Sequence, residues 1–126
     1  MAQGSAIIGR DHYRTEIVVG GHEIIADEPP ALGGQGAGPA PYDLLLASLG
    51  ACTAITLRMY ADRKEWPLES LGVALRLDGK DERRIERILT IVGLDDAQKA
   101  RLADVAERTP VTLTLKNGLP IDTHLA

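Results

Sequence analysis

The sequence predicts an α+β protein with antiparallel hairpins and a long central helix. Three observations lead to this prediction: a glycine pair between two β-rich runs, a long apolar stretch after a segment rich in Gly and Pro, and a second hairpin followed by a well-capped helix. The predicted order is β-β-α-β-β-α, then a short helix or strand, then a last strand. This is not the alternating order of a doubly wound parallel sheet, and it is typical of α+β folds.

The first hairpin is predicted over residues 6–28. Two runs rich in β-forming residues flank Gly20 and Gly21, a strong signal for a two-residue turn. If the two glycines form the loop, the register of the strands follows directly. The cross-strand pairs are then Val19 with His22, Ile17 with Ile24 and Arg14 with Asp27, and the last pair accounts for Arg14 structurally.

The central helix is predicted over residues 41–64, after a Gly- and Pro-rich loop at 29–40. Pro41 suits the first helical position, and Trp66-Pro67 ends the pattern. The stretch 44–57 carries no charge, but spanning a bilayer requires roughly 20 apolar residues. A helix that is apolar on every side is wrapped by other structure, so we expect a buried core helix.

A second hairpin is predicted over residues 70–92, and a helix over 95–108. Asp95 and Gln98 have the spacing of a capping box at the start of that helix. The C-terminal segment 109–126 is ambiguous, because its alternation favours a strand whereas Thr109-Pro110 favours the start of a short helix. Residues 119–125 are predicted as the last strand. The length of 126 residues suits a single domain over the whole chain.

The composition and the net charge argue against several classes of function. The formal net charge is −4 with no basic run, which argues against nucleic-acid and membrane-surface partners. The single cysteine excludes an intrachain disulfide and a cysteine zinc site. Because no histidine spacing suits a metal and the glycine loop lacks a phosphate-binding pattern, we expect no metal and no cofactor. The start of the chain does not read as a signal peptide, so a cytoplasmic protein with a reduced thiol is expected.

Cys52 is the one candidate nucleophile. It lies in the middle of the predicted helix, where we expect no help from a helix N-terminus, and apolar burial disfavours a thiolate. A reactive thiol there requires a nearby cation, for which Arg10, Arg14 and Arg58 are candidates. Its neighbours on the helical wheel are Ser48, Ile55, Thr56 and Met59. The alternative is that Cys52 is a small hydrophobic residue packed in the core.

The helix motif P-x-x-L-L-x-A-x-x-G-A-C that ends at Cys52, together with the later A-x-x-x-P-V, resembles the OsmC/Ohr family of osmotically inducible and organic-hydroperoxide-resistance proteins. The resemblance covers nearly the whole chain. It implies an OsmC-like fold, in which an intertwined homodimer clasps two long helices between antiparallel sheets. It also implies active sites at the subunit interface, which would explain a helix that is apolar all round.

Residue by residue, the resemblance implies that Cys52 is the cysteine that attacks the peroxide. The position of the second, resolving cysteine holds Thr109, and that of a helper glutamate holds Tyr42, with Asp43 beside it. The family's arginine is matched by Arg10 or Arg14, of which Arg10 follows a glycine as the family's arginine often does. The residues then expected around the substrate are Thr109, Tyr42, Asp43, Ser48 and Met59.

Two functions remain open at this point. In the first, the protein is a one-cysteine peroxidase for small organic hydroperoxides, and an external thiol recycles Cys52 because the chain has no second cysteine. In the second, the protein is a non-catalytic dimer that binds an apolar or thiol-containing ligand, and Cys52 is merely packed.

Overall fold

The computed structural model describes residues 2–126. The contacts of the chain fall into two compact units, the first ending at Leu45 and the second running from Leu46 to Ala126. The boundary lies within α1 (Pro41–Arg63), so one helix belongs to both units. Chain length predicts a single domain and does not reveal this internal boundary.

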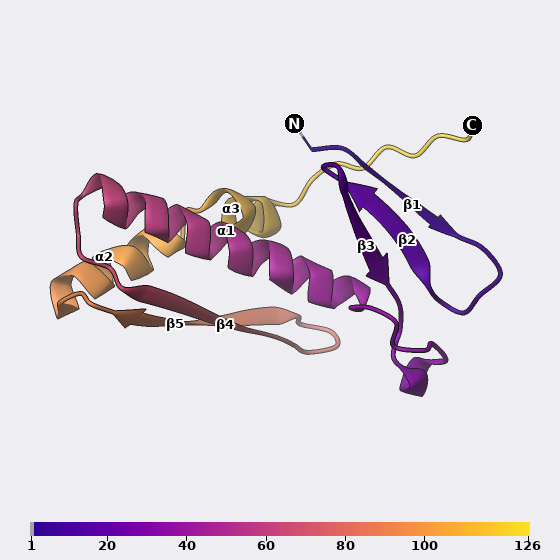
Figure 1. Ribbon diagram of the computed structural model, residues 1–126, viewed down its shortest axis with the longest axis horizontal. Coiled ribbons are helices and arrows are strands. Elements are labelled where there is room, and N and C mark those ends of the chain that lie inside the picture. The colour runs from indigo at the N-terminus through magenta and orange to yellow at the C-terminus, as the bar shows by residue number, and fades with distance from the viewer. Residues whose placement is uncertain (1) are drawn as a thin grey trace. The chain divides into compact units, whose positions relative to one another are not determined.

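The first unit contains a three-stranded antiparallel sheet in the order β1-β2-β3, labelled in Figure 1. Its strands are β1 (Gly4–Ile8), β2 (Thr15–Val19) and β3 (His22–Ala26). The predicted hairpin is confirmed as β2 and β3. Its register is confirmed as well, because Val19 pairs with His22 and Ile17 with Ile24.

The hairpin turn depends on its two glycines. Gly20 and Gly21 have φ values of 58° and 80°, and a two-residue turn with positive φ at both positions matches the twist of the strands. β1 was not predicted as a separate strand. It pairs along the whole of β2, from Gly4 opposite Val19 to Ile8 opposite Thr15.

Asp27 organises the loop that follows β3. Its side chain is only 2% exposed, and its carboxylate accepts hydrogen bonds from four backbone N–H groups at 2.7–3.2 Å. The donors are Tyr13, Glu28, Gln35 and Ala37. Burial opposes ionisation of Asp27, but these four donors together outweigh it and hold the pKa of the carboxyl below its usual value. The predicted pairing with Arg14 is wrong, because the loop donors occupy Asp27 and Arg14 instead pairs with Glu16 at 2.9 Å.

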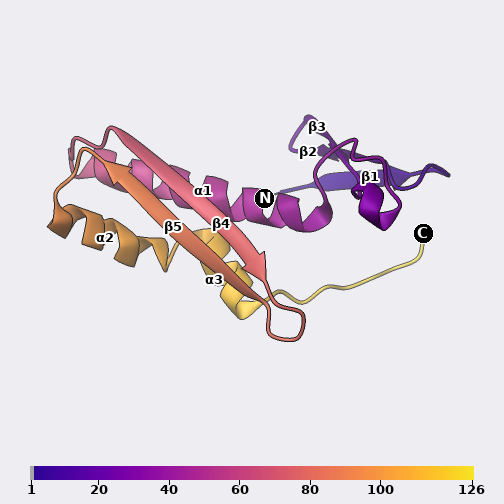
Figure 2. The ribbon, with the colours of Figure 1, turned by 90° about the horizontal axis from the view of Figure 1, so that it is seen from below.

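The hairpin and the capped helix predicted after α1 are both present in the second unit. The hairpin is formed by β4 (Ser70–Asp78) and β5 (Arg84–Val92), and α2 (Asp96–Ala106) follows with Asp95 and Gln98 in a capping box. Side chains along both strands alternate between half-buried and exposed, which shows that one face of the hairpin is covered. Figures 1 and 2 show the helices of this unit lying on one side of the hairpin.

The core of the second unit lies between α1, α2 and the hairpin. Leu57, Leu102 and Ala106 are almost completely buried in it. Partly buried side chains surround these three: Tyr60, Trp66, Leu71, Leu89, Ile91, Leu94 and Val105. The covered face of the hairpin therefore meets the buried faces of two helices, as an antiparallel sheet with one apolar face requires.

α1 is less enclosed than the sequence predicts. Its buried residues form one stripe at a spacing of four residues: Leu49, Thr53, Leu57 and Ala61. Ile55 and Met59 on another face are 55% and 54% exposed. The expected core helix is therefore buried by its own chain on one side only. By length and composition α1 is also apolar enough to cross a bilayer, although core helices of soluble proteins pass the same test.

The ambiguous C-terminal segment begins with a helix, α3 (Pro110–Asn117). The predicted last strand at 119–125 is wrong, since residues 118–126 have no regular secondary structure and are exposed. A strand requires a partner, and β4 and β5 pair only with each other within residues 2–126. Pro120 also removes one backbone donor from the segment.

Candidate functional site

The thiol of Cys52 lies at the N-terminus of α3. Its sulfur accepts a hydrogen bond from the backbone N–H of Val111 at 3.5 Å and lies 3.9 Å from the hydroxyl of Thr56. Cys52 itself is partly exposed rather than sealed in the core. The expectation that no helix N-terminus would assist Cys52 is wrong, because the relevant helix is α3, 59 residues further along the chain.

The start of α3 explains why this N–H is available. Pro110 occupies the first helical turn and has no N–H, so Val111 carries the next backbone donor of the turn. N–H groups in the first turn of a helix have no partner within the helix. The N–H of Val111 is therefore available to the sulfur of Cys52. Thr109-Pro110 in the sequence predicts the start of this helix, but nothing in the sequence predicts that the helix start faces Cys52.

Arg87 of β5 holds this junction together. Its guanidinium donates to the hydroxyls of Thr53 at 3.0 Å and Thr112 at 2.8 Å, and to the carbonyl of Ala106 at 2.9 Å. Thr53 belongs to α1, Ala106 ends α2, and Thr112 belongs to α3. One side chain thus ties three helices together and fixes α3 against the helix that carries Cys52.

Sequence reasoning missed Arg87, although the strand pattern held a signal. Ile85, Leu89 and Ile91 share the inward parity of β5, and Arg87 has the same parity. A charged residue at an inward position of a strand requires buried polar partners, because an unpaired buried charge is costly. The two threonines that supply such partners could not be identified from spacing alone.

Thr109 lies buried at the start of α3. It is 1% exposed, and its hydroxyl lies 2.6 Å from that of Thr112 and 3.4 Å from the carbonyl of Ala106. It occupies the N-cap position of α3 but makes no capping hydrogen bond with its side chain. In the described residues this hydroxyl is bonded to Thr112 and Ala106 and not to the sulfur of Cys52. A place for Thr109 beside the substrate stays a prediction.

The predicted arginines lie elsewhere in the chain. Arg10 is exposed between β1 and β2, and Arg14 pairs with Glu16. Both belong to the unit that ends at Leu45, whereas Cys52 belongs to the other, so their action on the thiol stays a prediction. Arg58 donates to Asp62 and to the carbonyl of Leu68. In the part of the chain that the structure describes, no arginine donates a hydrogen bond to the sulfur.

The remaining predicted site residues lie along α1. Tyr42 is half-exposed in the first turn, and Asp43 accepts a hydrogen bond from the N–H of Ala40 at 2.9 Å. Asp43 therefore satisfies a backbone donor at the helix start. Ser48 and Met59 are exposed, four residues before and seven residues after Cys52. Over residues 2–126, no group of three or more His, Cys, Asp or Glu side chains is placed to hold a metal ion.

The motif around Cys52 and the order of the elements agree with a known family. The family model described as OsmC-like protein matches residues 34–124, which is most of the chain. This chain belongs to the OsmC-like family. The match includes the helix with Cys52 and the start of α3, so it covers both parts of the contact described above.

Solved structures of OsmC-like proteins share the fold of this OsmC-like chain. A protein of Psychrobacter arcticus described as an osmotic stress induced and detoxification response protein is 25% identical, with 90% of this chain and 88% of that chain covered and a TM-score of 0.77. An organic hydroperoxide resistance protein OsmC of Legionella pneumophila is 22% identical over 92% and 89%, with a TM-score of 0.66.

A third structure carries a bound molecule. It is a Vibrio cholerae protein named for organic hydroperoxide resistance, with captopril in one of its active sites. It is 19% identical to this chain over 92% of this chain and 84% of its own, with a TM-score of 0.70. At this identity the likeness shows the fold alone. None of the curated proteins compared with the chain matches it.

Proposed function

We propose that this OsmC-like protein is a one-cysteine peroxidase that reduces small organic hydroperoxides. The observation that carries the proposal is the contact between the sulfur of Cys52 and the N–H of Val111 at the N-terminus of α3. A partly exposed thiol at a helix N-terminus has the surroundings of a reactive cysteine rather than those of an inert core residue. The names of the Legionella and Vibrio structures support the substrate class.

The chemistry proceeds in steps that balance. The thiolate of Cys52 attacks one oxygen of the O–O bond, the bond breaks, and the alkoxide leaves and takes a proton to become an alcohol. Cys52 is then a sulfenic acid. Because Thr109 stands where the family has its second cysteine, an external thiol condenses with the sulfenic acid and releases water. A second external thiol then breaks this mixed disulfide, which restores Cys52 and leaves the external disulfide.

We further propose that the protein acts as a homodimer. Ile55 and Met59 lie one turn apart on the helix that carries Cys52 and are more than half exposed. Neighbouring exposed apolar side chains form a surface that a partner can cover. A second copy that covers this face would enclose the thiol and provide an apolar surface for an uncharged substrate. It could also supply Arg10 or Arg14 as the cation that the mechanism expects. We place the protein in the cytoplasm, where reduced thiols are available.

A stopped-flow experiment tests the peroxidase. Reduced protein is mixed with cumene hydroperoxide, its thiol is counted over time, and dimedone traps the sulfenic acid for mass spectrometry. We expect one adduct on Cys52, faster oxidation by cumene hydroperoxide than by hydrogen peroxide, and turnover when dithiothreitol is added. Cys52→Ser is the control and should show neither adduct nor turnover.

The same experiment separates the proposal from the alternative function, a dimeric binding protein with an inert cysteine. Slow thiol loss without a dimedone adduct at modest peroxide excess would exclude the peroxidase function and favour the binding function. In that case, native mass spectrometry of freshly purified protein should reveal a retained small molecule. The loss of the second cysteine is the feature that favours this alternative.

The dimer is tested separately by analytical ultracentrifugation. Ile55→Lys places a charge on the exposed face of α1 and should shift the protein toward the monomer. Ala103→Lys places the same charge on an exposed position of α2 and should leave the mass unchanged. If the wild type is a monomer at micromolar concentration, the proposed dimer is excluded, whereas the proposed chemistry of Cys52 is not affected by this result.

A further inference from the structure

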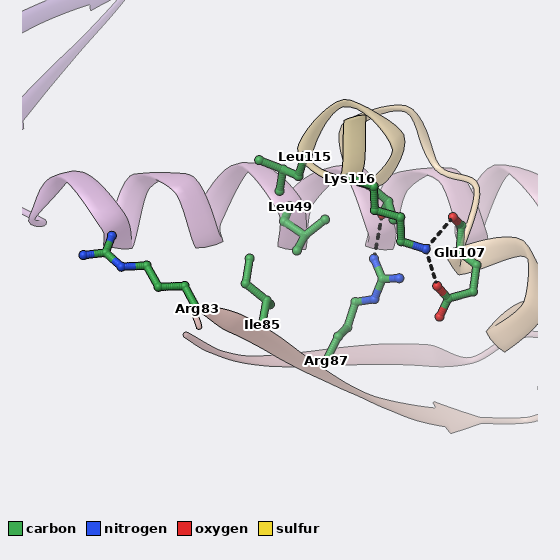
Figure 3. A pocket seen from close by; sticks show the side chains of 8 residues that line it. Leu49, Arg83, Ile85, Arg87, Glu107, Leu115 and Lys116 are labelled. Carbon is green, nitrogen blue, oxygen red and sulfur yellow. Dashed lines mark hydrogen bonds and ion pairs between the residues drawn. The ribbon is translucent and has the colours of Figure 1, made fainter. Parts of the chain in front are cut away.

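A pocket of about 410 Å³ opens in the second unit, between α1, β5 and α3. It is drawn in Figure 3, and its volume lies in the range of small-molecule sites. Eight residues line it: Leu49, Arg83, Ile85, Arg87, Glu107, Thr112, Leu115 and Lys116. Cys52 is not among them, so the pocket is separate from the thiol chemistry proposed above.

The lining of this pocket has an apolar middle and charged ends. Leu49, Ile85 and Leu115 come together from three different elements and form the aliphatic part, as Figure 3 shows. Arg83 lies at one end, and Arg87, Lys116 and Glu107 lie at the other. A pocket built in this way suits an amphiphilic molecule that has a short aliphatic chain and a charged head.

The charged side chains at this end of the pocket determine which charge the head group of a ligand should carry. Lys116 pairs with Glu107 at 2.7 Å, and this hydrogen bond holds the pKa of Glu107 below its usual value, so Glu107 is ionised at neutral pH. Two cations and one carboxylate leave a single net positive charge at this end of the pocket. A monoanion matches that charge, whereas Glu107 would repel the second charge of a phosphate.

Arg87 still has donors for such an anion. Three of its five N–H groups are used, on Thr53, Thr112 and the carbonyl of Ala106. Those three bonds also fix the guanidinium, so an anion would meet a donor that is already oriented. Preorganisation of this kind reduces the entropy lost on binding.

We propose that this pocket is a binding site for a small carboxylate with an aliphatic chain. The carboxylate meets Arg87 and Lys116, and the chain lies along the three aliphatic side chains toward Arg83. Arg83 adds positive potential at a distance and attracts the anion into the pocket. The proposal does not depend on Cys52 or on peroxide chemistry, because none of the lining residues takes part in that proposed reaction.

Titration of the isotope-labelled full-length protein with octanoate tests the site. We expect methyl shifts at Leu49, Ile85 and Leu115 and a Kd on the order of 1 mM. Acetate has only the head and 1-octanol only the chain, so each should bind at least about tenfold more weakly than octanoate. Equal binding of 1-octanol, or methyl shifts confined to other parts of the protein, would overturn the proposal.

Charge variants make the test specific. Lys116→Gln removes one cation and leaves Glu107 unpaired, so octanoate should bind about tenfold more weakly. Lys99→Gln, on an exposed position of α2, is the matched control and should change nothing. Arg83→Gln should weaken binding about twofold, and its neighbour Arg84→Gln, which does not line the pocket, should have no effect.

Glu107→Gln gives an effect of opposite sign. It removes the repulsion at the head of the pocket, so octanoate should bind about threefold more tightly. A variant that merely disturbed the fold would not strengthen binding. Weaker or unchanged binding in Glu107→Gln, or an equal loss in Lys116→Gln and Lys99→Gln, would therefore contradict the site.

Discussion

The two units of the molecule are held together by different interactions. In the first unit, the positions buried within residues 2–45 are Ala26 and Asp27, and a carboxylate with four backbone donors takes the place of an apolar core. In the second, Leu57 and Leu102 are fully buried among aliphatic and aromatic neighbours. A buried carboxylate thus organises the first unit, whereas the second has an apolar core to which the hydrogen bonds of Arg87 are added.

This difference indicates which unit depends on other surfaces. Small sheets require an apolar face covered by other structure to be stable in water. The first unit leaves Ile7 and Val18 exposed at 71% and 47%, whereas the second covers one face of its hairpin with its own helices. We infer that the second unit holds its shape through its own core, and that the first gains more from the proposed dimer.

The largest effect is expected from the core of the second unit. Leu102→Ala removes a fully buried side chain beside Leu57 and Ala106. Such a cavity lowers the free energy of unfolding by about 2–5 kcal/mol. Urea unfolding measures this loss, and Leu113→Ala, at a position 41% exposed, is the control that should cost much less. Similar losses in both variants would mean that Leu102 does not anchor the core.

A second effect should appear in the first unit and depend on pH. The pKa of Asp27 lies below its usual value of 3.8 in the folded state, so its contribution to stability is complete above that value. The contribution is lost as the pH falls through the folded-state value. Asp27→Asn should therefore be less stable than wild type at pH 7, and the difference should shrink as the solution is acidified.

Thermal unfolding from pH 7 to pH 3 measures this difference for Asp27. Asp11→Asn, an exposed substitution in the same unit, is the matched control and should follow the wild type at every pH. Hydrogen exchange at the amides of Gln35 and Ala37, which donate to Asp27, should quicken in the variant. A gap between wild type and Asp27→Asn that stays constant with pH would show that the carboxylate charge is not what holds the loop.

Arg87→Lys should have a smaller effect, confined to the second unit. Lysine keeps the charge but cannot reach three separate acceptors with one planar group. We expect a loss of about 2 kcal/mol in the free energy of unfolding. Alkylation of Cys52 by iodoacetamide should also become slower, because α3, whose first turn carries the N–H that meets the sulfur, is held less firmly. Arg84→Lys, three residues earlier on β5, is the control. An unchanged alkylation rate in Arg87→Lys would show that this junction does not influence the reactivity of Cys52.

The smallest effect is expected from the exposed charges of the hairpin. Arg76 pairs with Asp78 at 2.8 Å and with Glu86 at 3.1 Å, but its side chain is 68% exposed. Solvent screens such pairs, so Arg76→Gln should change the free energy of unfolding by less than about 0.5 kcal/mol. A loss as large as that of Leu102→Ala would mean that surface charge, and not burial, stabilises the second unit.

Local signals in the sequence were enough to predict most of the fold. The glycine pair determined the register of β2 with β3, and the capping box located the start of α2. The family motif predicted the OsmC-like fold, whereas the role that it implies for Cys52 stays a prediction. The last strand was wrong because pairing depends on a neighbour, and alternation in a sequence does not reveal whether that neighbour exists.

The surroundings of Cys52 were harder to predict than the fold. Val111 is 59 residues away and contributes a backbone atom, which no side-chain pattern can reveal. Arg87 could have been noticed from its inward parity on β5, but Thr53 and Thr112 are 34 and 25 residues from it. Contacts over such distances are set by the packing of the second unit, and not by local spacing.

Arg87 belongs at once to the wall of the pocket and to the junction of three helices. A molecule that takes up the free donors of its guanidinium would alter the side chain that ties α3 to α1. The start of α3, with the N–H that faces the sulfur, would then be held more or less tightly according to what fills the pocket. In this arrangement the reactivity of the thiol and the occupancy of the pocket would both depend on the position of the Arg87 guanidinium.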